Sequence, residues 1–462
     1  MPPATTVINI PSGPGFEPTA NAPIVTRDMK EMLEAVDEGC LLDLFIIIIE
    51  RAQANNAEGV HPDMRNLIRD VDSRRKVVEL VHSIPRRLIK GMVLGITALQ
   101  HNLPGDHPLH VAERVYNHDG PGVYVASIAV AGRSGRGWTG AELGRIIRSI
   151  EKYVEAWTSL ERLAGSKPTT PVDKELANFA AQVDAQLRVG SATRTKKVMY
   201  ISGGIQKDKV EAVLGTLKHM RAGLADDVES AQLLSYYGCS STSAHKRPEA
   251  HTPAKGWYQG KGNHPYWLLM SVMKRIGIEP EVKPKTVIRT WEFGQLRLAE
   301  TVGTMLGLGG SLVEDWGLNV QSPGGKPDNP DHDFTMDELA ATVWNPWLRS
   351  QLEETATLVK RRLELNEKLD RAFDICGETW GSMRAETERN AEDVEGVKPK
   401  TAKLRSILAL TRRKLSELAS RLRADVNQGS DFVAIVDELL DNLRGAERWM
   451  TYEEGASSPA WL

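Results

Sequence analysis

The stretch that decides the fold reads Tyr236-Tyr237-Gly238-Cys239-Ser240-Ser241, followed by Lys246-Arg247 and then by His251. The residues from Leu233 to Cys239 predict a strand, and the whole segment has the length of a strand, a turn and a helix. It brings a phenol, a fixed positive charge and an imidazole close together in the chain. Any chemistry of this protein is therefore sought first in this segment.

Cleavage of a phosphodiester bond needs groups of this kind. The reaction requires an activated nucleophile, a cation beside the phosphate oxygens and a stabiliser for the leaving oxygen. Tyr237 or His251 can move a proton, and Arg247 can neutralise charge on the phosphate. Glu300, on an expected helix, can hold one Mg²⁺ whose other positions are filled by water. Asn319 lies in a Gly-rich loop further on.

Strands and helices alternate around this segment. Three further strands are expected from their composition, at 122–130, 196–202 and 286–291. Helices are expected at 141–163, 173–187, 208–224, 265–276 and 295–306. This order predicts an α+β fold that is mostly α-helical and has a small mixed or antiparallel sheet.

Helical regions are expected on both sides of this part of the chain. Residues 1–22 are expected to be a disordered tail, and residues 23–115 an N-terminal helical region that Thr26 begins and Pro85 interrupts. Residues 331–450 predict long helices, one of them at 348–376, and residues 451–462 a tail. Leucines at 404, 408, 415, 418 and 422 form a heptad stripe that predicts a helical hairpin or coiled coil, through which copies of the chain could associate.

Composition limits the partners. The 462 residues carry a formal net charge of −3, so binding of nucleic acid would need a local basic patch. The three cysteines lie far apart, which fits a reducing compartment. No signal peptide is recognisable, and the longest apolar run, 45–49, is too short to span a bilayer. We expect a nuclear or cytoplasmic protein with no membrane partner.

The residues from about 196 to 326 resemble the GIY-YIG endonuclease domain. Tyr236 to Ser240 is similar to the family's YIG-[ST] strand, with Tyr237 as its tyrosine. Arg247 stands where the family has its catalytic arginine, and His251 where many members have a histidine. The segments 263–277, 298–300 and 317–319 are similar to the family's next helix, to its metal-binding glutamate helix and to its GxN closing motif.

The resemblance leaves open which residue is the family's first tyrosine, that of the GIY strand. Tyr200 is nearer in sequence to the YIG-like strand, but no glycine stands two residues before it. Tyr124 in Gly122-Val123-Tyr124-Val125 fits the triplet and requires a longer helical insertion within a domain at 116–330. We favour Tyr124, because a glycine before an exposed tyrosine lets the backbone approach a site closely.

The resemblance implies a metal-dependent endonuclease that hydrolyses DNA. Glu300 would hold Mg²⁺ or Mn²⁺, and Tyr237 with the first tyrosine would position and deprotonate the attacking water. Arg247 would bind the phosphate, and His251 would assist proton transfer. DNA contacts are expected from residues around the site: Lys246, Lys255, Lys261, Lys274 and Asn319.

Two other functions fit the same sequence. One is a catalytically inactive platform on this fold that binds nucleic acid or protein, and the other is a helical scaffold that self-associates through its C-terminal leucines. Catalysis requires Tyr237, Arg247 and Glu300 to converge on one phosphate. The scaffold depends only on the leucine stripe.

Overall fold

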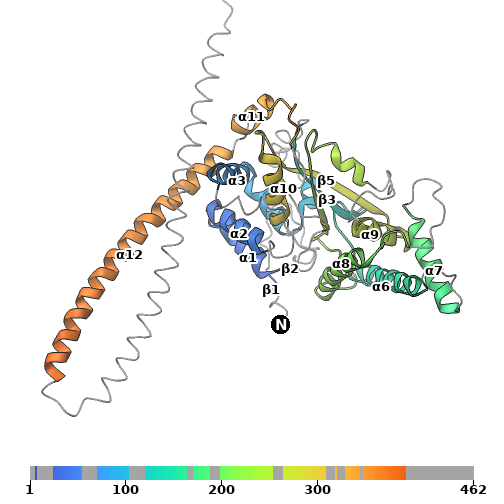
Figure 1. Ribbon diagram of the computed structural model, residues 1–462, viewed down its shortest axis with the longest axis horizontal. Helices are drawn as coiled ribbons and strands as arrows, with labels where there is room; N and C mark the ends of the chain where they lie inside the picture. The colour runs from blue at the N-terminus through green and yellow to red at the C-terminus, as the bar shows by residue number, and fades with distance from the viewer. Residues whose placement is uncertain are drawn as a thin grey trace, which may run out of the picture. The chain divides into compact units, whose positions relative to one another are not determined.

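The computed structural model describes residues 6–7, 24–54, 70–102, 120–163, 170–187, 198–252, 264–307, 318–319, 328–343, 345 and 347–391. The chain divides into one unit from Met1 to Leu348 and another from Arg349 to Leu462. The first unit holds all the described strands and the described helices up to α11 (Thr335–Thr342) (Figure 1). The predicted class is confirmed, because the described residues are mostly helical and include one small antiparallel sheet of three strands.

The three-stranded sheet is built around β3 (Gly122–Val130), which has the predicted bounds. It lies between β4 (Ser235–Ser240) and β5 (Pro280–Arg289), and it is antiparallel to both. The strand predicted at 196–202 is wrong for its described part, residues 198–202. There the N–H of Tyr200 donates to the hydroxyl of Tyr153, at 3.0 Å, and not to a neighbouring strand.

One face of this sheet is covered by α10 (Gln295–Leu306), which also has the predicted bounds. A Cβ on Gly303 would lie 2.9 Å from Cγ1 of Val123, so the helix lies very close to the central strand. On its other side α10 contacts α2 (Leu41–Ala54), α3 (Val71–Ser83) and α4 (Arg86–Val93) (Figure 1). The N-terminal helices and the sheet are therefore parts of one packed unit.

The N-terminal helices follow from local signals. Thr26 caps α1 (Arg27–Asp37) as predicted, because its hydroxyl accepts from the N–H of Met29 at 3.2 Å. A second break in the expected N-terminal helical region lies at Gly39, which adopts a left-handed conformation with φ +82° between α1 and α2. Pro85 separates α3 from α4 as predicted. In the predicted tail, β1 (Thr6–Val7) is a short strand, and it pairs with β2 (Ile24–Val25), which follows the tail.

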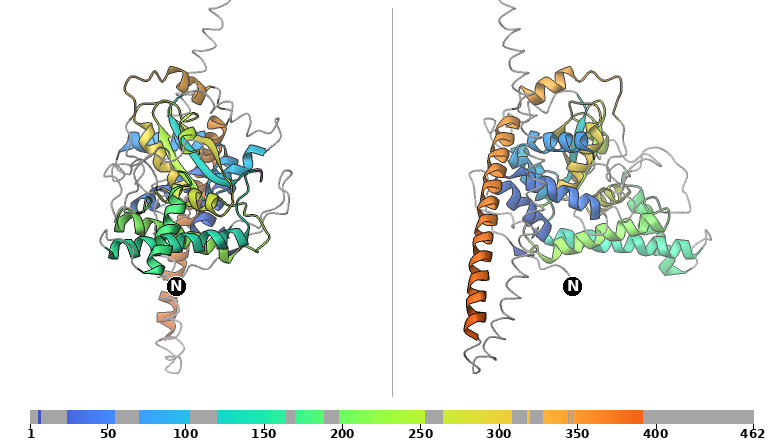
Figure 2. Two further views of the ribbon diagram at one scale, coloured as in Figure 1. Left: turned by 90° about the vertical axis from the view of Figure 1, so that its right-hand side faces the viewer. Right: turned by 60° about the vertical axis from the view of Figure 1, so that its left-hand side comes forward.

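Most of the described residues between β3 and β4 are in helices. These helices are α6 (Gly140–Arg162), α7 (Pro171–Asp184) and α8 (Gly204–Ala222). All three contact α9 (His264–Arg275), which comes after β4 in the chain (Figures 1 and 2). The described residues of the first unit also include the short 3₁₀ helices η3 (Thr97–Asn102) and η4 (Arg247–His251).

In the second unit the structure describes a single long helix. The helix predicted at 348–376 is α12 (Leu348–Ala391), which continues further than expected. The leucine stripe at 404–422 lies outside the described residues. Among the helices of the described part, none has the length and apolar character that crossing a membrane requires.

Candidate functional site

The chain leaves β4 through a turn made by serine and threonine residues. The Ser240 hydroxyl accepts from the N–H groups of Thr242 and Ser243, at 3.4 and 3.1 Å. The carbonyl of Ser243 then accepts from the N–H of Arg247, at 3.1 Å. Such side-chain acceptors satisfy the backbone of a tight turn. They allow η4 to turn back onto β3 and β5, which it contacts.

The centre of the site is a contact between β3 and the last residue of η4. The hydroxyl of Tyr124 lies 2.9 Å from Nε2 of His251, within hydrogen-bonding distance. Tyr124 is only 2% exposed, whereas His251 is half-buried and reaches the surface. The buried phenol therefore contacts the imidazole from the protein side. Of the two residues, only His251 is accessible enough to contact a substrate.

Tyr236 is the second tyrosine of the site. Opposite residues of an antiparallel pair share a face, and so do alternate residues of one strand. Gly238 is opposite Tyr124, so Tyr236, two residues before it, lies on the Tyr124 face. Its ring centroid is 4.8 Å from that of His251 and 6.3 Å from that of Tyr124. A Cβ on Gly238 would lie 2.6 Å from the Tyr124 hydroxyl oxygen, so only glycine fits between the rings.

Tyr266 of α9 completes this aromatic cluster. Its hydroxyl donates to the backbone carbonyl of His251, at 3.2 Å, and its ring meets the imidazole edge-on with centroids 5.9 Å apart. Its ring centroid also lies 6.1 Å from that of Tyr236. Tyr266 is completely buried, so it fixes the end of η4 from inside the protein.

Electrostatics link two further predicted residues to the cluster. Burial, and then the charge of Arg247, lower the pKa of His251 to about 4, so its imidazole is neutral at pH 7. Burial raises the pKa of Tyr236 to about 12 and raises that of Tyr124 further. Glu300 adds to both increases, and the positive charge of Arg247 opposes both. Arg247, which is exposed, and Glu300, which is half-buried on α10, therefore act on the same two phenols.

The structure places Tyr237 away from this group. It is 1% exposed and lies on the opposite face of the sheet, because successive side chains of a strand alternate. A Cβ on Gly307, just after α10, would lie 2.0 Å from Cζ of Tyr237. The phenol thus packs beneath the end of α10, and burial raises its pKa. Tyr237, the tyrosine expected to be catalytic, therefore does not lie beside His251, and Tyr236 does. The sequence did contain a signal for this placement. Tyr236 and Gly238 are alternate residues of one strand and share a face, and Gly238 is the residue opposite Tyr124.

Of the two candidates for the first tyrosine, only Tyr124 lies in the cluster. Tyr200 is completely buried, and its hydroxyl lies 2.6 Å from that of Ser271 on α9. It connects the inserted helices to α9, and it belongs to no strand. Tyr200 is therefore a core residue, and Tyr124 is the tyrosine that meets His251.

Asn319 has a structural task at the edge of β4. Its side-chain oxygen accepts from the N–H of Tyr237 at 2.8 Å, and its side-chain NH₂ donates to the carbonyl of the same residue at 2.7 Å. The N–H of Leu318 donates to the carbonyl of Ser235 at 2.9 Å. Residues 318–319 thereby pair with the outer edge of the strand. The buried amide of Asn319 thus braces β4, and both of its polar atoms are used within the protein and not presented to DNA.

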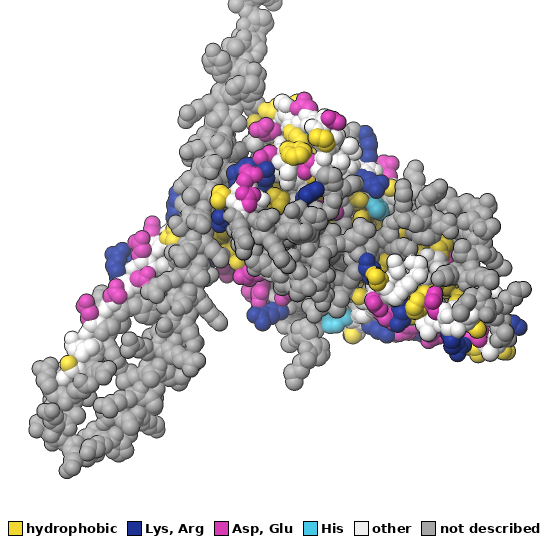
Figure 3. Space-filling model, in the orientation of Figure 1, with side chains coloured by type: hydrophobic (Ala, Val, Ile, Leu, Met, Phe, Trp, Pro, Cys, Tyr) yellow, Lys and Arg dark blue, Asp and Glu magenta, His cyan; other side chains and the backbone are white. Residues whose placement is uncertain are grey.

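The lysines expected to contact DNA have different positions. Lys246 is exposed next to Arg247, and Lys274 on α9 forms an ion pair with Glu279 at 3.4 Å. Lys255 and Lys261 lie outside the described residues. On the face drawn in Figure 3, the Lys and Arg side chains of the described residues are mixed with Asp and Glu side chains. Charge on that face forms no single basic patch among the residues that are described.

The side chains around the candidate site suit a metal ion that keeps most of its water ligands. Among the described residues, no three His, Cys, Asp or Glu side chains gather in a way that could hold a metal ion. Glu300 is the carboxylate whose charge reaches the two tyrosines. One carboxylate suits Mg²⁺ or Mn²⁺ that keeps most of its water and gains phosphate oxygens from a substrate. It does not suit an ion enclosed by protein ligands.

Comparisons with known proteins add no further guide. No family model, no curated protein and no solved structure matches this chain. The function is therefore argued from the geometry of Tyr124, Tyr236, Arg247, His251 and Glu300.

Proposed function

We propose that this chain is a metal-dependent phosphodiesterase that cuts DNA at the Tyr124–Tyr236–His251 cluster. The observation that carries the proposal is the imidazole of His251, which lies 2.9 Å from the buried phenol of Tyr124 and near enough to the charge of the exposed Arg247 for that charge to lower its pKa. A neutral imidazole can accept a proton from water at physiological pH. Arg247 supplies the fixed positive charge that a phosphate needs close by.

Each residue has a distinct part in this proposal. Tyr124 is a positioning residue, because its hydroxyl forms a hydrogen bond with Nε2 of His251. The other ring nitrogen, Nδ1, is then the atom that exchanges a proton with solvent or substrate. Tyr236, which is half-buried, presents a protonated phenol that can donate to a phosphate oxygen. Arg247 binds the phosphate. Glu300 would hold Mg²⁺ or Mn²⁺, which when bound supplies charge neutralisation at the leaving oxygen.

The test is relaxation of supercoiled plasmid in Mg²⁺ or Mn²⁺. Glu300→Ala and Tyr236→Phe are expected to lower the rate by about a hundredfold or more, as loss of a proton-transfer or charge-stabilising group does. Tyr237→Phe is the matched control, since it removes the same hydroxyl from the neighbouring residue on the other face. It is expected to cleave as the parent does. Absence of cleavage by the parent, or equal rates for the parent and Glu300→Ala, refutes the proposal.

A second candidate function follows from the burial of Tyr124. Because this phenol is only 2% exposed, a cluster that merely stiffens η4 would present Arg247 and Lys246 for binding without catalysis. A binding platform of this kind retains DNA in a filter-binding assay at low salt and releases it as salt rises. It leaves supercoiled plasmid intact with every metal tested.

A further inference from the structure

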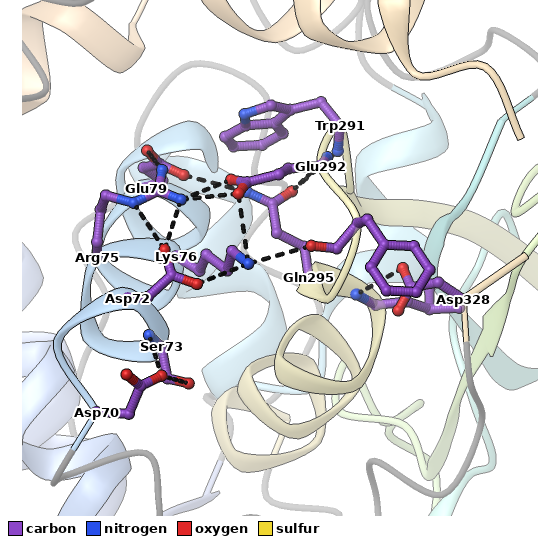
Figure 4. Close-up of polar contacts among 12 residues, drawn as sticks. Asp70, Asp72, Ser73, Arg75, Lys76, Glu79, Trp291, Glu292, Gln295 and Asp328 are labelled. Carbon is purple, nitrogen blue, oxygen red and sulfur yellow. Dashed lines mark hydrogen bonds and ion pairs between the residues drawn. The ribbon is translucent and has the colours of Figure 1, made fainter. Parts of the chain in front are cut away.

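A closed ring of polar contacts joins α3 to the start of α10 (Figure 4). The carboxylate of Glu79 accepts from Nε2 of Gln295 at 3.1 Å and from Nη1 of Arg75 at 2.6 Å. Nη2 of Arg75 donates to both oxygens of Glu292, at 2.8 and 2.9 Å. The side-chain oxygen of Gln295 accepts from the N–H groups of Trp291 and Glu292, at 2.9 and 3.2 Å, which closes the ring.

The first turn of α10 depends on residues from elsewhere in the chain. Its N-cap position is Gly294, which has φ +88° and no side chain to cap the helix. The N–H groups at a helix start must find other acceptors. Asp328 accepts from the N–H of Leu296 at 3.4 Å, and Gln295 holds the backbone that enters the helix. Lys76 Nζ also donates to the carbonyl of Phe293, at 3.1 Å.

Gln295 is completely buried, and the side chain of Glu79 is only 10% exposed. A buried polar group that lacks a hydrogen-bond partner destabilises the folded protein. The ring therefore favours the one arrangement of its side chains in which all their hydrogen bonds are made. Five residues after Gln295, the same helix carries Glu300. A helix is stiff over this distance, so a shift of its first turn also moves that carboxylate.

We propose that Arg75 and Glu79 of α3, together with Gln295 of α10, are positioning residues for Glu300. This inference rests on the proposed function, because it gives Glu300 a task that depends on its position. Displacements of about 1 Å at a catalytic group are enough to cost a hundredfold in rate. The N-terminal helices accordingly do more than cover apolar surface.

The test compares Gln295→Ala with Asp70→Ala. Asp70 caps α3 by accepting from the N–H of Ser73 at 2.9 Å, so its loss weakens α3 while the ring stays complete. Hydrogen exchange of the amides from 295 to 300 is the first measurement. Gln295→Ala is expected to speed this exchange by about ten- to hundredfold, as loss of a hydrogen bond to a charged partner does. Asp70→Ala is expected to leave it unchanged.

The second measurement is the concentration of Mg²⁺ that gives half-maximal plasmid relaxation. It is expected to rise about tenfold in Gln295→Ala, with DNA binding unchanged, and to stay constant in Asp70→Ala. Glu79→Gln keeps the shape of the side chain, replaces one of the two acceptor oxygens of the ring by an NH₂ donor and removes the charge that faces Arg75. Because Gln295 keeps its bonds to the backbone, a smaller change is expected in both measurements. Glu79→Gln provides a second variant if Gln295→Ala does not fold.

The outcomes separate this inference from the proposed function. Unchanged exchange at 295–300 in both ring variants overturns the positioning role even if the parent cleaves DNA. Equal changes in the ring variants and in Asp70→Ala also overturn it, because general destabilisation would then explain them. Faster exchange in the ring variants alone supports the control of α10 by the ring. Absence of cleavage by the parent refutes the proposed function, and with it the role of Glu300, but leaves the control of α10 by the ring in place.

Discussion

Replacement of Glu79 by Gln isolates the effect of one buried charge on stability. Burial raises the pKa of this carboxyl from 4.5 to about 7, while the positive charge of Arg75 opposes the increase and the negative charge of Glu292 adds to it. In the unfolded chain the carboxyl is expected to titrate at its ordinary value. The folded protein therefore binds a proton that the unfolded chain releases between about pH 4.5 and pH 7.

The sign and the size of the effect follow from linkage. The folded pKa is the higher one, so the contribution of Glu79 to stability is complete below pH 4.5 and is lost as the pH rises through 7. The two pKa values differ by about 2.5, and each unit corresponds to about 1.36 kcal/mol. The unfolding free energy of the parent should therefore fall by about 3 kcal/mol relative to that of Glu79→Gln between pH 4 and pH 8.

The assay is urea unfolding of both proteins at several pH values in that range. The difference between their unfolding free energies is expected to move by about 3 kcal/mol in favour of the variant as the pH rises. Glu338→Gln on α11, where the side chain is exposed, controls for the loss of one negative charge. A difference between parent and Glu79→Gln that is independent of pH would refute the burial argument.

Three further predictions concern the site. Because the pKa of His251 is lowered from 6.5 to about 4, kcat/KM for plasmid cleavage should fall only below about pH 5; an acid limb near 6.5 would contradict the neutral, buried imidazole. Asn319→Ala removes both bonds to the backbone of Tyr237 and should lower the unfolding free energy by about 3 kcal/mol in urea; a loss below about 1 kcal/mol would show that β4 needs no such brace. Gly238→Ala places a Cβ against the Tyr124 hydroxyl, so it should lower the unfolding free energy by about 1–3 kcal/mol and remove most of the cleavage activity. Unchanged cleavage would show that the contact between Tyr124 and His251 is dispensable.

Secondary structure was predictable where a local pattern was strong. β3 and α10 have the expected bounds, because a run of β-branched residues and a 3.6-residue period are properties of the segment itself. The strand expected at 196–202 had a suitable composition, but the described part of it has no partner strand. Tyr200 is used there in packing between helices, through Tyr153 and Ser271. Tertiary contacts override propensity in a segment this short.

The segments that meet in the candidate site were predictable, but the faces on which their side chains lie were not. Two adjacent tyrosines in β4 are equally suitable by composition, and only the face that receives η4 distinguishes Tyr236 from Tyr237. That face depends on which strand pairs with β4. The partner is β3, which is separated from β4 in the sequence by α6, α7 and α8. Likewise, nothing local to Asn319 indicates that its amide pairs with the edge of a strand. Long-range pairing sets both properties.

The two faces of β4 make different contacts. The Tyr236 face carries the contacts with His251 and Tyr266, while the Tyr237 face packs against the end of α10. The bonds from Asn319 to the backbone of Tyr237 hold the strand edge between them. Loss of the Tyr236 hydroxyl should therefore lower activity in a protein that remains stable. Disruption of Tyr237 packing should lower stability first, and activity only in proportion to the fraction of protein that unfolds.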